Sequence, residues 1–561
     1  MLDRALALHR SGDSEAARTL YRSIIARDAG NFDALHLLGV ITAQGGDPAA
    51  GLSLMDRAIA INPGDVAVRC NRGVALRALG RLDAALASFD AAIALRPDCA
   101  EAYVHRGVVL RELRQPGVAL ASYDRAIALR PDAAAAHFNR GNLLRELRQP
   151  AAAVESYDRA IALRPDFADA FLHRGNVLRE LRQPQAALAS YDQALAIKAD
   201  YAEAHLNRGT VLREAMQLEA ALQSYNRAIA LRPDYAEAYA NRATVRLLLG
   251  DFDHGWRDYE WRWSRSGGPD VPRSRHGRER LWLGESSLEG KTILLSAEQG
   301  LGDTLQFCRY AAVLSGLGAR VLLEVQPPLV SVLATVDGVS QVFAIGSELP
   351  SFELHCPLLS LPLALKTRID SIPAAQGYLQ ADAARVAKWR ERLAAYRGLR
   401  IGLAWSGNRQ HSHDRDRSIP LATLLAGLPT DFQYISLQKD VREVDARTLH
   451  ARADVLDLRS ELRDFDDTAA LCKNLDVVIS VDSAVAHLSG ALGQPTWVLL
   501  PFHPDWRWLT ERSDSPWYRS VRLFRQVRAG RWDEVVARVS SELVARLAQS
   551  LSSSSARAGT A

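Results

Sequence analysis

The sequence predicts a chain of two parts, an all-α solenoid of repeated helix pairs followed by an α/β region with parallel strands and crossover helices. Two observations lead to this prediction. Small and aromatic residues recur every 34 residues through the first half, and from Lys291 onward short apolar runs alternate with helical patterns. At 561 residues the chain is also too long for a single hydrophobic core.

Most units of the repeat carry a glycine, two alanines and an aromatic residue at fixed positions, and a proline such as Pro97 or Pro131 closes most units. Glycine and alanine let helices approach closely, the aromatic ring fills the gap between neighbours, and proline ends the second helix. This pattern resembles the tetratricopeptide repeat (TPR), with about eight units in residues 1–265. The glycine row is Gly39, Gly73, Gly107, Gly141, Gly175 and Gly209, and the aromatic row is Phe89, Tyr123, Tyr157, Tyr191, Tyr225 and Tyr259.

A row of amide and imidazole side chains is expected to face the concave groove of this solenoid. An asparagine carries both a donor and an acceptor, so the row can bind the backbone of an extended peptide without reading its side chains. The row resembles the asparagine ladder with which TPR-containing O-GlcNAc transferases hold polypeptide substrates. Its members are Asn71, His105, Asn139, His173, Asn207 and Asn241.

A second groove row consists of arginines, each followed by a residue that is glutamate in four of the units. The glutamates offset the arginine charge, so we expect no strong preference for acidic peptides. Solvated positions copied by duplication are the alternative interpretation of both rows. The arginines are Arg77, Arg111, Arg145, Arg179 and Arg213, and the glutamates are Glu112, Glu146, Glu180 and Glu214.

The composition excludes several classes of protein. A net charge of +4 is small for this length and predicts no nucleic-acid partner. No run of about 20 uncharged apolar residues is present, so we expect no membrane span. Five scattered cysteines fit free thiols in a reducing compartment, and the N-terminal residues read as an amphipathic helix and not as a signal peptide. Together with abundant alanine and arginine, these features predict a cytoplasmic protein of bacterial origin.

From residue 286 onward we expect two doubly wound halves. Apolar runs predict strands at 292–296, 320–325, 400–405, 432–437, 476–481 and 496–500. The predicted domains are the solenoid (1–265), a Gly-, Pro- and Arg-rich junction (266–285), a first half (286–380), a second half (381–548) and a disordered tail (549–561). An aromatic cluster that includes Trp256 and Tyr259 is expected to pack the last repeat against the next domain.

Two loops after predicted strands carry polar side chains at the strand ends where ligands of such folds bind. In residues 298–303 the glycines permit a tight turn, and Asp303 either caps the following helix or acts as a functional carboxylate. Residues 405–420 are rich in donors, among them Ser406 and Asn408, and Arg415 and Arg417 are suited to a diphosphate. The Asp414-to-Asp416 triplet could hold a metal, but the arginines around it argue against a cation, and we expect no metal site.

A third loop joins a predicted strand to a helix of small residues. Asp482 and Ser483 stand where free backbone N–H groups and the helix dipole favour an anion, and His487 lies one turn into the helix. A lone histidine is more often structural, but its place in this loop favours a functional role.

Residues 291–527 resemble the heptosyltransferase-like (family 9-like) glycosyltransferases of the GT-B fold. The resemblance rests on Gly302 and Asp303, on the basic segment from Arg417 to Pro420, and on the Asp-Ser-x-x-x-His run from Asp482 to His487. The family usually has Asp-Thr-Gly-Pro-x-His, and here Ala484 and Val485 replace the Gly-Pro pair. The whole architecture, including residues 501–508, is similar to TPR-type flagellin glycosyltransferases.

The resemblance implies metal-independent, inverting transfer without a bound cofactor, from a nucleotide-diphosphate sugar as co-substrate. Asp303 would be the general base, and the donor would be bound by the second half. The residues implied in donor binding are Ser406, Asn408, Arg417, Gln438, Lys439, Asp482, Ser483 and His487.

Three functions remain open at this point. The first is glycosylation of Ser or Thr hydroxyls of a polypeptide that the TPR groove holds. The second is a non-catalytic TPR scaffold for protein–protein interaction with a vestigial glycosyltransferase-like domain. The third is a glycosyltransferase for lipid or polysaccharide acceptors.

Overall fold

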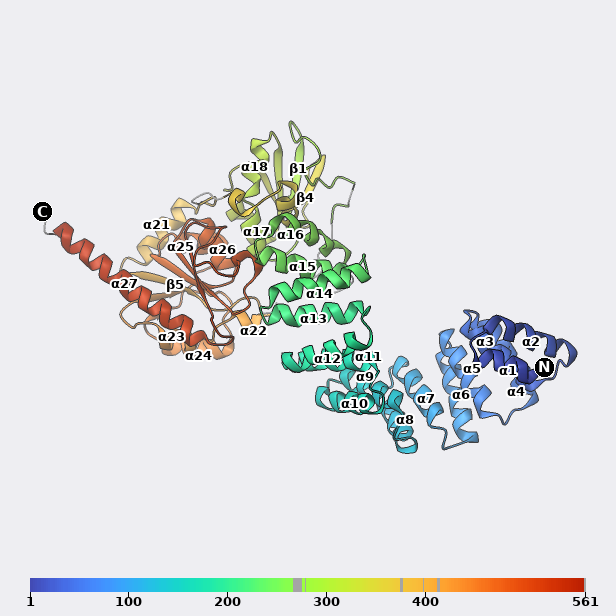
Figure 1. The fold of residues 1–561 in the computed structure, drawn as a ribbon. Coiled ribbons are helices and arrows are strands. Elements are labelled where there is room, and N and C mark those ends of the chain that lie inside the picture. Colours follow the sequence, from blue (N-terminus) through green and yellow to red (C-terminus); the bar gives the residue numbers. More distant parts are fainter. Residues whose placement is uncertain (266–274, 278, 374–376, 397, 411–413, 559–561) are drawn as a thin grey trace. The chain divides into compact units, whose positions relative to one another are not determined.

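The computed structural model describes residues 1–561 except 266–274, 278, 374–376, 397, 411–413 and 559–561, and it describes side chains as far as Leu547. The predicted junction covers residues 266–285, and its residues 266–274 and 278 lie outside the described residues. The chain forms two compact units, Met1–Ala215 and Met216–Ala561 (Figure 1). Each is described by itself below.

The first unit consists of antiparallel helix pairs, and consecutive pairs pack on one another. This is the all-helical solenoid that the 34-residue period predicts. Its helices are α1 (Leu2–Arg10), α2 (Ser14–Arg27), α3 (Phe32–Gln44), α4 (Pro48–Ile61), α5 (Val66–Ala78), α6 (Leu82–Leu95), α7 (Ala100–Glu112), α8 (Pro116–Leu129), α9 (Ala134–Glu146), α10 (Pro150–Leu163), α11 (Ala168–Glu180), α12 (Pro184–Ile197) and α13 (Ala202–Glu214).

In the four helix pairs from α5/α6 to α11/α12, an aromatic ring lies directly on a glycine. A Cβ atom on Gly141 would lie 2.7 Å from a ring carbon of Tyr157, and one on Gly175 would lie 2.6 Å from Tyr191. The rings are fully buried. The periodic glycines are therefore required by packing, because a larger side chain would push the two helices of the pair apart.

A repeated arginine, which the sequence analysis did not single out, joins three successive helices of the solenoid. Arg140 on α9 donates to the Asp124 carboxylate of α8 at 2.7 Å and to the Ser156 hydroxyl of α10 at 2.8 Å. Arg72, Arg106 and Arg174 make the same two bonds in their own repeats. The signal in the sequence is the Arg-Gly dipeptide that recurs with the period.

The second unit begins with the last repeat helices, α14 (Leu218–Leu231), α15 (Ala236–Leu248) and α16 (Phe252–Tyr259), and with the 3₁₀ turn η1 (Glu260–Ser264). The Trp256 ring meets Trp506 at 5.2 Å, and its Nε1 donates to the Thr367 carbonyl at 3.1 Å. Arg262 of η1, which is buried, pairs with Glu298 at 3.0 Å. The aromatic cluster thus packs the last repeat against the α/β part as expected, and the compact unit begins before the predicted boundary at residue 265 because of these buried contacts.

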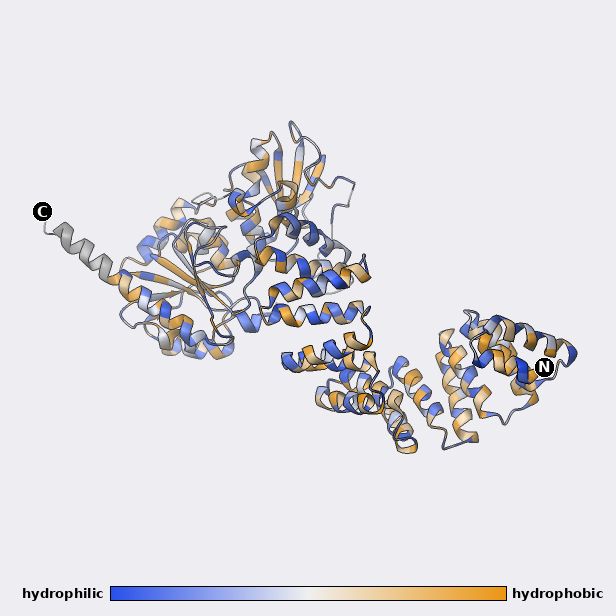
Figure 2. Cartoon of the chain, viewed as in Figure 1, coloured by the Kyte–Doolittle hydropathy of each residue, from blue (hydrophilic) through white to orange (hydrophobic). Residues whose placement is uncertain are grey.

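Two parallel sheets form the rest of the second unit, and their strands are strongly apolar (Figure 2). The first sheet has the order β3-β2-β1-β4 and the second has the order β10-β9-β8-β5-β6-β7. The strands are β1 (Thr292–Ser296), β2 (Arg320–Val325), β3 (Val339–Ala344), β4 (Leu354–Pro357), β5 (Arg400–Ala404), β6 (Gln433–Ser436), β7 (Val455–Leu456), β8 (Val477–Val481), β9 (Thr496–Leu500) and β10 (Val521–Arg525). All six predicted strands are present, and β3, β4, β7 and β10 were not predicted.

Helices and short 3₁₀ turns connect the strands. The connecting elements are α17 (Leu301–Phe307), α18 (Tyr310–Gly316), η2 (Pro327–Leu329), α19 (Val330–Leu333), η3 (Leu358–Ser360), α20 (Leu361–Ala364), η4 (Ile369–Ser371), α21 (Ala383–Arg392), α22 (Asp414–Arg417), α23 (Leu421–Gly427), α24 (Glu443–Ala451), α25 (Phe465–Cys472), α26 (Ala484–Ala491) and η5 (Trp506–Trp508). The last helix, α27 (Trp532–Ala558), replaces most of the disordered tail expected at 549–561. Alanine, leucine, arginine and serine there can extend a helix that has already been nucleated by the packed residues before them.

We predict that Gly141→Val destabilises the solenoid by about 2–3 kcal/mol, because the new side chain collides with Tyr157 and is β-branched. Valine is used instead of alanine, because Ala243 at the same register position of the last repeat indicates that a single methyl group can be accommodated there. The control is Gly117→Ala on α8, where nothing lies within 4 Å, and its stability should be unchanged or higher by up to about 1 kcal/mol. Urea unfolding followed by circular dichroism measures both changes, and equal stability of the two variants would contradict the packing role.

Candidate functional site

Each of the two sheets has one point at which the strand order reverses. In the first sheet the reversal lies between β1 and β4, and in the second it lies between β8 and β5. Loops diverge at such points, so they leave room for a ligand. The segment with Asp303 follows β1, the segment with Arg417 follows β5, and Asp482 follows β8, so all three predicted loops stand at reversal points.

Helix α17 of the first half packs against α26 of the second half. A Cβ atom on Gly302 would lie 2.8 Å from Cδ2 of the His487 ring, so only glycine permits this approach. The contact brings the N-terminus of α17, with Asp303, to the helix that follows Asp482 and Ser483. The predicted residues of the first and third loops are therefore brought together.

Both carboxylate oxygens of Asp303 have protein partners. Its Oδ2 accepts the backbone N–H of Gly300 at 2.8 Å, which caps α17, and its Oδ1 pairs with Arg507. Asp303 is therefore not the N-cap that was weighed, which is Gly300; it is the third residue of α17, and its side chain bonds back to the N-cap backbone, as the third residue of a capping box does. An ionised carboxylate has about four lone-pair positions, so these two bonds still leave acceptor capacity toward a ligand.

Arg507 is a residue of the site that the sequence analysis missed, although it had noted the segment 501–508. Its guanidinium is only 8% exposed and donates to Gln306 Oε1 at 2.8 Å and to Asp505 Oδ1 at 2.8 Å in addition to Asp303. Asp303 and Gln306 belong to α17, whereas Arg507 belongs to the loop after β9. Arg507 thus joins the two halves at the point where the loops meet.

Asp482, His487 and Tyr518 form a chain of polar contacts beside Asp303. His487 Nδ1 lies 2.8 Å from the Tyr518 hydroxyl, its Nε2 lies 3.6 Å from Asp482 Oδ1, and its ring stacks on Trp508. Burial alone would raise the pKa of Asp482. The interaction with His487 and the charges of Arg417 and Arg507 outweigh burial and hold the pKa of this carboxyl below its usual value.

Arg417 provides positive charge next to Asp482. Its guanidinium lies over Gly407, where any side chain would collide with it, and its Nε is buried without a hydrogen-bond partner among the described residues. Asp414 of the possible metal triplet is buried and pairs with Arg442 and Ser418. The positive charge of Arg442 therefore offsets the negative charge of the Asp414 carboxylate. His411, Ser412 and His413 lie outside the described residues.

Most of the remaining residues that were predicted to bind the nucleotide sugar form hydrogen bonds with backbone groups of other residues of the protein. Gln438 accepts the N–H groups of Trp405 and Ser406 at 3.2 and 3.0 Å, and so it ties the loop after β6 to the loop after β5. Lys439 donates to the Leu462 carbonyl, and Asn408 accepts the N–H of Gln410 at 3.0 Å. Ser406 lies beside Gln438 and is buried.

Among the residues that the structure describes, no cluster of three His, Cys, Asp or Glu side chains has a geometry suitable for a metal ion. In the same residues, no helix combines the length and apolar character needed to cross a bilayer.

In the first unit, the side chains of the predicted amide and imidazole row differ in whether they already contact other protein groups. Asn71 bonds to the His36 ring at 2.8 Å, and Asn207 donates to Asn176 at 2.9 Å. His173 packs against Phe138 at 5.3 Å, and burial together with Arg145 lowers its pKa to about 4. Asn241 lies on α15 in the second unit. Only His105 and Asn139 line a hollow that is described next.

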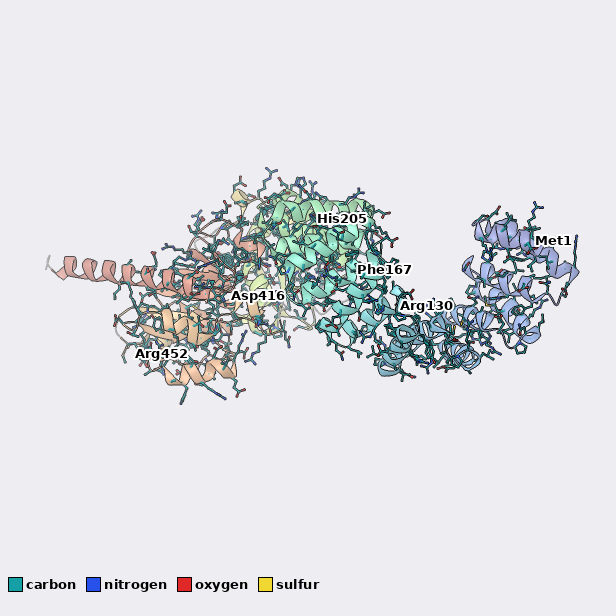
Figure 3. The ribbon with its side chains drawn as sticks, turned by 60° about the horizontal axis from the view of Figure 1, so that its bottom comes forward. Met1, Arg130, Phe167, His205, Asp416 and Arg452 are labelled. Carbon is teal, nitrogen blue, oxygen red and sulfur yellow. The ribbon has the colours of Figure 1, made fainter. Side chains whose placement is uncertain are left out.

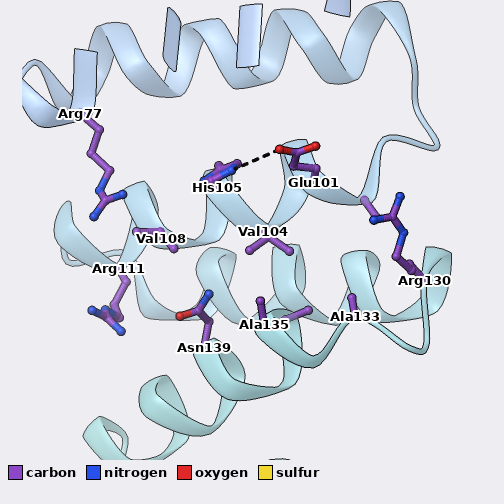
Figure 4. A pocket seen from close by; sticks show the side chains of 12 residues that line it. Arg77, Glu101, Val104, His105, Val108, Arg111, Arg130, Ala133, Ala135 and Asn139 are labelled. Atoms are coloured by element: carbon purple, nitrogen blue, oxygen red, sulfur yellow. Dashed lines mark ion pairs between the residues drawn. The ribbon is translucent and has the colours of Figure 1, made fainter. Parts of the chain in front are cut away.

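A hollow of about 450 Å³ opens between α5, α7 and α9 of the solenoid (Figure 4). Arg77 and Arg111 from the predicted arginine row, His105 and Asn139 from the amide row, and small apolar side chains such as Val104 line it. The His105 ring stacks on Phe89 and its Nε2 lies 3.8 Å from the Glu101 carboxylate. The two predicted rows thus meet at one hollow of ligand size.

Comparison with known proteins identifies the repeats. A tetratricopeptide-repeat model matches residues 2–66, 70–134, 109–166 and 138–202, and a second TPR model matches residues 211–250. The N-terminal part of the chain is a TPR solenoid. Among solved structures, YrrB, described as a TPR protein with an unusual peptide-binding site, is 25% identical, with a TM-score of 0.29, over 33% of this chain and 95% of its own. PilF of Pseudomonas aeruginosa is 20% identical, with a TM-score of 0.35, over 39% of this chain and 99% of its own.

A curated relative extends beyond single repeats. Protein FlbA of Caulobacter vibrioides is 28% identical over 328 residues, which are 53% of this chain and 53% of that protein. The chain thus spans about half the length of this relative.

We predict that the solenoid loses stability as the pH falls from 6.5 toward 4, in part through His173. The buried imidazole stays neutral in the folded chain down to its pKa of about 4, whereas the unfolded chain takes up a proton near 6.5. The loss should be on the order of 1–2 kcal/mol, because the ring is partly exposed.

His173→Asn removes this contribution with the residue that neighbouring repeats carry at the same position, Asn139 and Asn207. Urea unfolding of both chains across this pH range measures the difference. The variant should lose less stability on acidification than the parent, and parallel curves would show that His173 does not titrate as described.

Proposed function

We propose that the chain is a glycosyltransferase of the GT-B type that moves a sugar from a nucleotide-sugar donor to a hydroxyl of a polypeptide held by the TPR groove. One observation carries this proposal. Helix α17, which carries Asp303 after the first sheet, packs against α26, which follows Asp482 and Ser483 after the second sheet, and Gly302 lies against His487 there. Two parallel sheets with their ligand-binding ends facing a shared site suit a reaction between two substrates.

Asp303 is proposed as the general base that takes the proton of the acceptor hydroxyl. A general base must be ionised and must reach the hydroxyl through a free lone pair. The ion pair with Arg507 and the bond from the Gly300 N–H fix the orientation of the carboxylate. Arg507 is then a positioning residue, since it acts through Asp303.

The donor diphosphate is proposed to bind between Arg417 and the N-terminus of α26. The backbone N–H groups that follow Ser483 and the guanidinium of Arg417, whose Nε lies 3.8 Å from Asp414 Oδ1, are donors for phosphate oxygens. As the sugar leaves the diphosphate, negative charge grows on these oxygens. The same fixed positive groups stabilise that charge, which is the role a metal ion has in other transferases.

A second candidate function is a TPR scaffold whose α/β part no longer catalyses. Specific contacts favour it: Gln438 and Lys439 are engaged with backbone groups, Asp303 has two protein partners, and Ala484 and Val485 stand where the glycosyltransferases that the chain resembles have Gly-Pro. The following two experiments separate this function from the first.

The donor site predicts nucleotide binding that does not depend on a metal. Titration calorimetry of the full chain against nucleoside diphosphates and nucleotide sugars, in the presence of EDTA, should find one nucleotide that binds. Arg417→Ala should weaken it at least about tenfold, because a charge-assisted bond to phosphate is lost.

Arg415→Ala is the matched control, because Arg415 is an exposed residue of the same short helix, α22. It should bind like the parent chain. No binding by any nucleotide, or equal losses in both variants, would favour the scaffold.

The base assignment predicts that Asp303→Asn lowers transfer to a polypeptide acceptor about 10²- to 10⁴-fold with donor binding unchanged. Asparagine keeps the shape and the cap but cannot take the proton. Transfer is measured by mass spectrometry of the acceptor with the donor found above.

Asp505→Asn is the control, since Asp505 contacts the same arginine, Arg507, at 2.8 Å. Its transfer should fall far less. An equal loss in both variants would assign the effect to the Arg507 contacts and not to a base at position 303.

A further inference from the structure

The hollow of the first unit is charged at its two ends and apolar between them. Figure 4 shows Arg77 and Arg111 at one end, Arg130 at the other, and Val104, Ala135 and Asn139 between them. Arg111 lies in the last turn of α7, and Arg130, which is labelled in Figure 3, follows the last residue of α8. Because α7 and α8 are antiparallel partners, these arginines stand at opposite ends of the pair, about 15–20 Å apart for a helix of this length.

The arginines at the two ends have unused donors. Arg77 pairs with Glu112 at 2.9 Å, but Arg111 is 3.9 Å from Glu146, beyond hydrogen-bond distance. Arg130 has no ion pair within the described part of the chain and is exposed. Three arginines of the row pair with the glutamate of the next repeat, so the glutamates offset the arginine charge as expected: Arg77 with Glu112, Arg111 with Glu146 and Arg179 with Glu214. The long Arg111 contact still leaves its hydrogen-bond donors available to a ligand.

The middle of the hollow is suited to backbone and small side chains. The Asn139 amide has no hydrogen-bond partner among the described residues and lies between the charged ends. Val104, Val108, Ala133 and Ala135 leave the floor shallow and apolar. Glu101 is the one carboxylate among the lining side chains. Its contact with His105 and the charge of Arg130 lower the pKa of Glu101, so it stays negative and disfavours a second carboxylate beside it.

We propose that this hollow binds an extended polypeptide segment with a carboxylate side chain at each end and small or apolar side chains between. The carboxylates pair with Arg111 and Arg130, and the backbone between them bonds to Asn139. An extended chain covers the distance between the arginines with roughly five or six residues. The inference rests on the proposed function of the groove as a polypeptide site, but not on catalysis.

The test measures fluorescence anisotropy of labelled peptides with the full chain. The probe has two glutamates separated by roughly five or six residues of alanine, valine and serine. One control peptide has glutamine in place of both glutamates, and another has the two glutamates adjacent. The spaced-glutamate peptide should bind at least about tenfold tighter than either control.

Arg111→Ala and Arg130→Ala should each weaken the spaced-glutamate peptide about three- to tenfold and leave the glutamine peptide unchanged. Arg125→Ala is the matched control, because this exposed arginine lies on α8 and does not line the hollow. Arg130→Glu should restore binding of a peptide that carries lysine at one end. That rescue distinguishes a direct pair from a loss of folding.

Three results would overturn the proposal: equal binding of the glutamate and glutamine peptides, an Arg125→Ala effect as large as that of Arg130→Ala, or preferential binding of an RNA oligomer that displaces the peptide. The assay contains no nucleotide sugar. A chain that binds the peptide but transfers no sugar would refute the proposed enzyme and support this site, and the reverse result would refute this site alone.

Discussion

The approach of α17 to α26 is the contact on which the α/β part depends. A glycine at position 302 lets the His487 ring lie against the backbone of α17, and only this distance allows Arg507 to reach Asp303 from the other half. The buried guanidinium would be costly without its three acceptors, so the arrangement is stable only when both halves are docked. The loops after β1 and β8 consequently meet in one place.

The solenoid depends on a different mixture of forces. Aromatic rings on glycines give the helix pairs from α5/α6 to α11/α12 their close packing, while the arginine that bonds to an aspartate before it and a serine after it links three helices in register. Packing supplies most of the stability, because partly exposed ion pairs contribute little. The directional bonds instead fix how each pair is rotated on the next. Both features repeat every 34 residues, so the groove side chains also repeat in space.

Central elements of the fold could be predicted from the sequence because they are buried on both faces. The strands β1, β2, β5, β6, β8 and β9 lie inside the sheets and form apolar runs, whereas the four missed strands are all at sheet edges. An edge strand can carry polar residues, as in β3 and in β10 with Arg522 and Arg525, so its pattern is weak.

The candidate site was predictable to the extent that a residue follows a strand. Asp303, Arg417 and Asp482 were found in this way. Arg507 was not, because its loop has no local pattern that marks a buried arginine, and its partners Asp303 and Gln306 lie about two hundred residues earlier. The backbone bonds of Gln438 and Lys439 also depend on tertiary contacts that the sequence does not display.

The compact α/β unit includes its own terminal repeat helices, sealed by Trp256, Trp506 and the buried Arg262. Repeats upstream of Met216 are built on a uniform period and make contacts mainly with their neighbours. Whole repeats can therefore be gained or lost there by duplication or deletion without exposing the tryptophans. Such changes would alter the number of repeats that can contact a partner and leave the packed core of the α/β part unchanged.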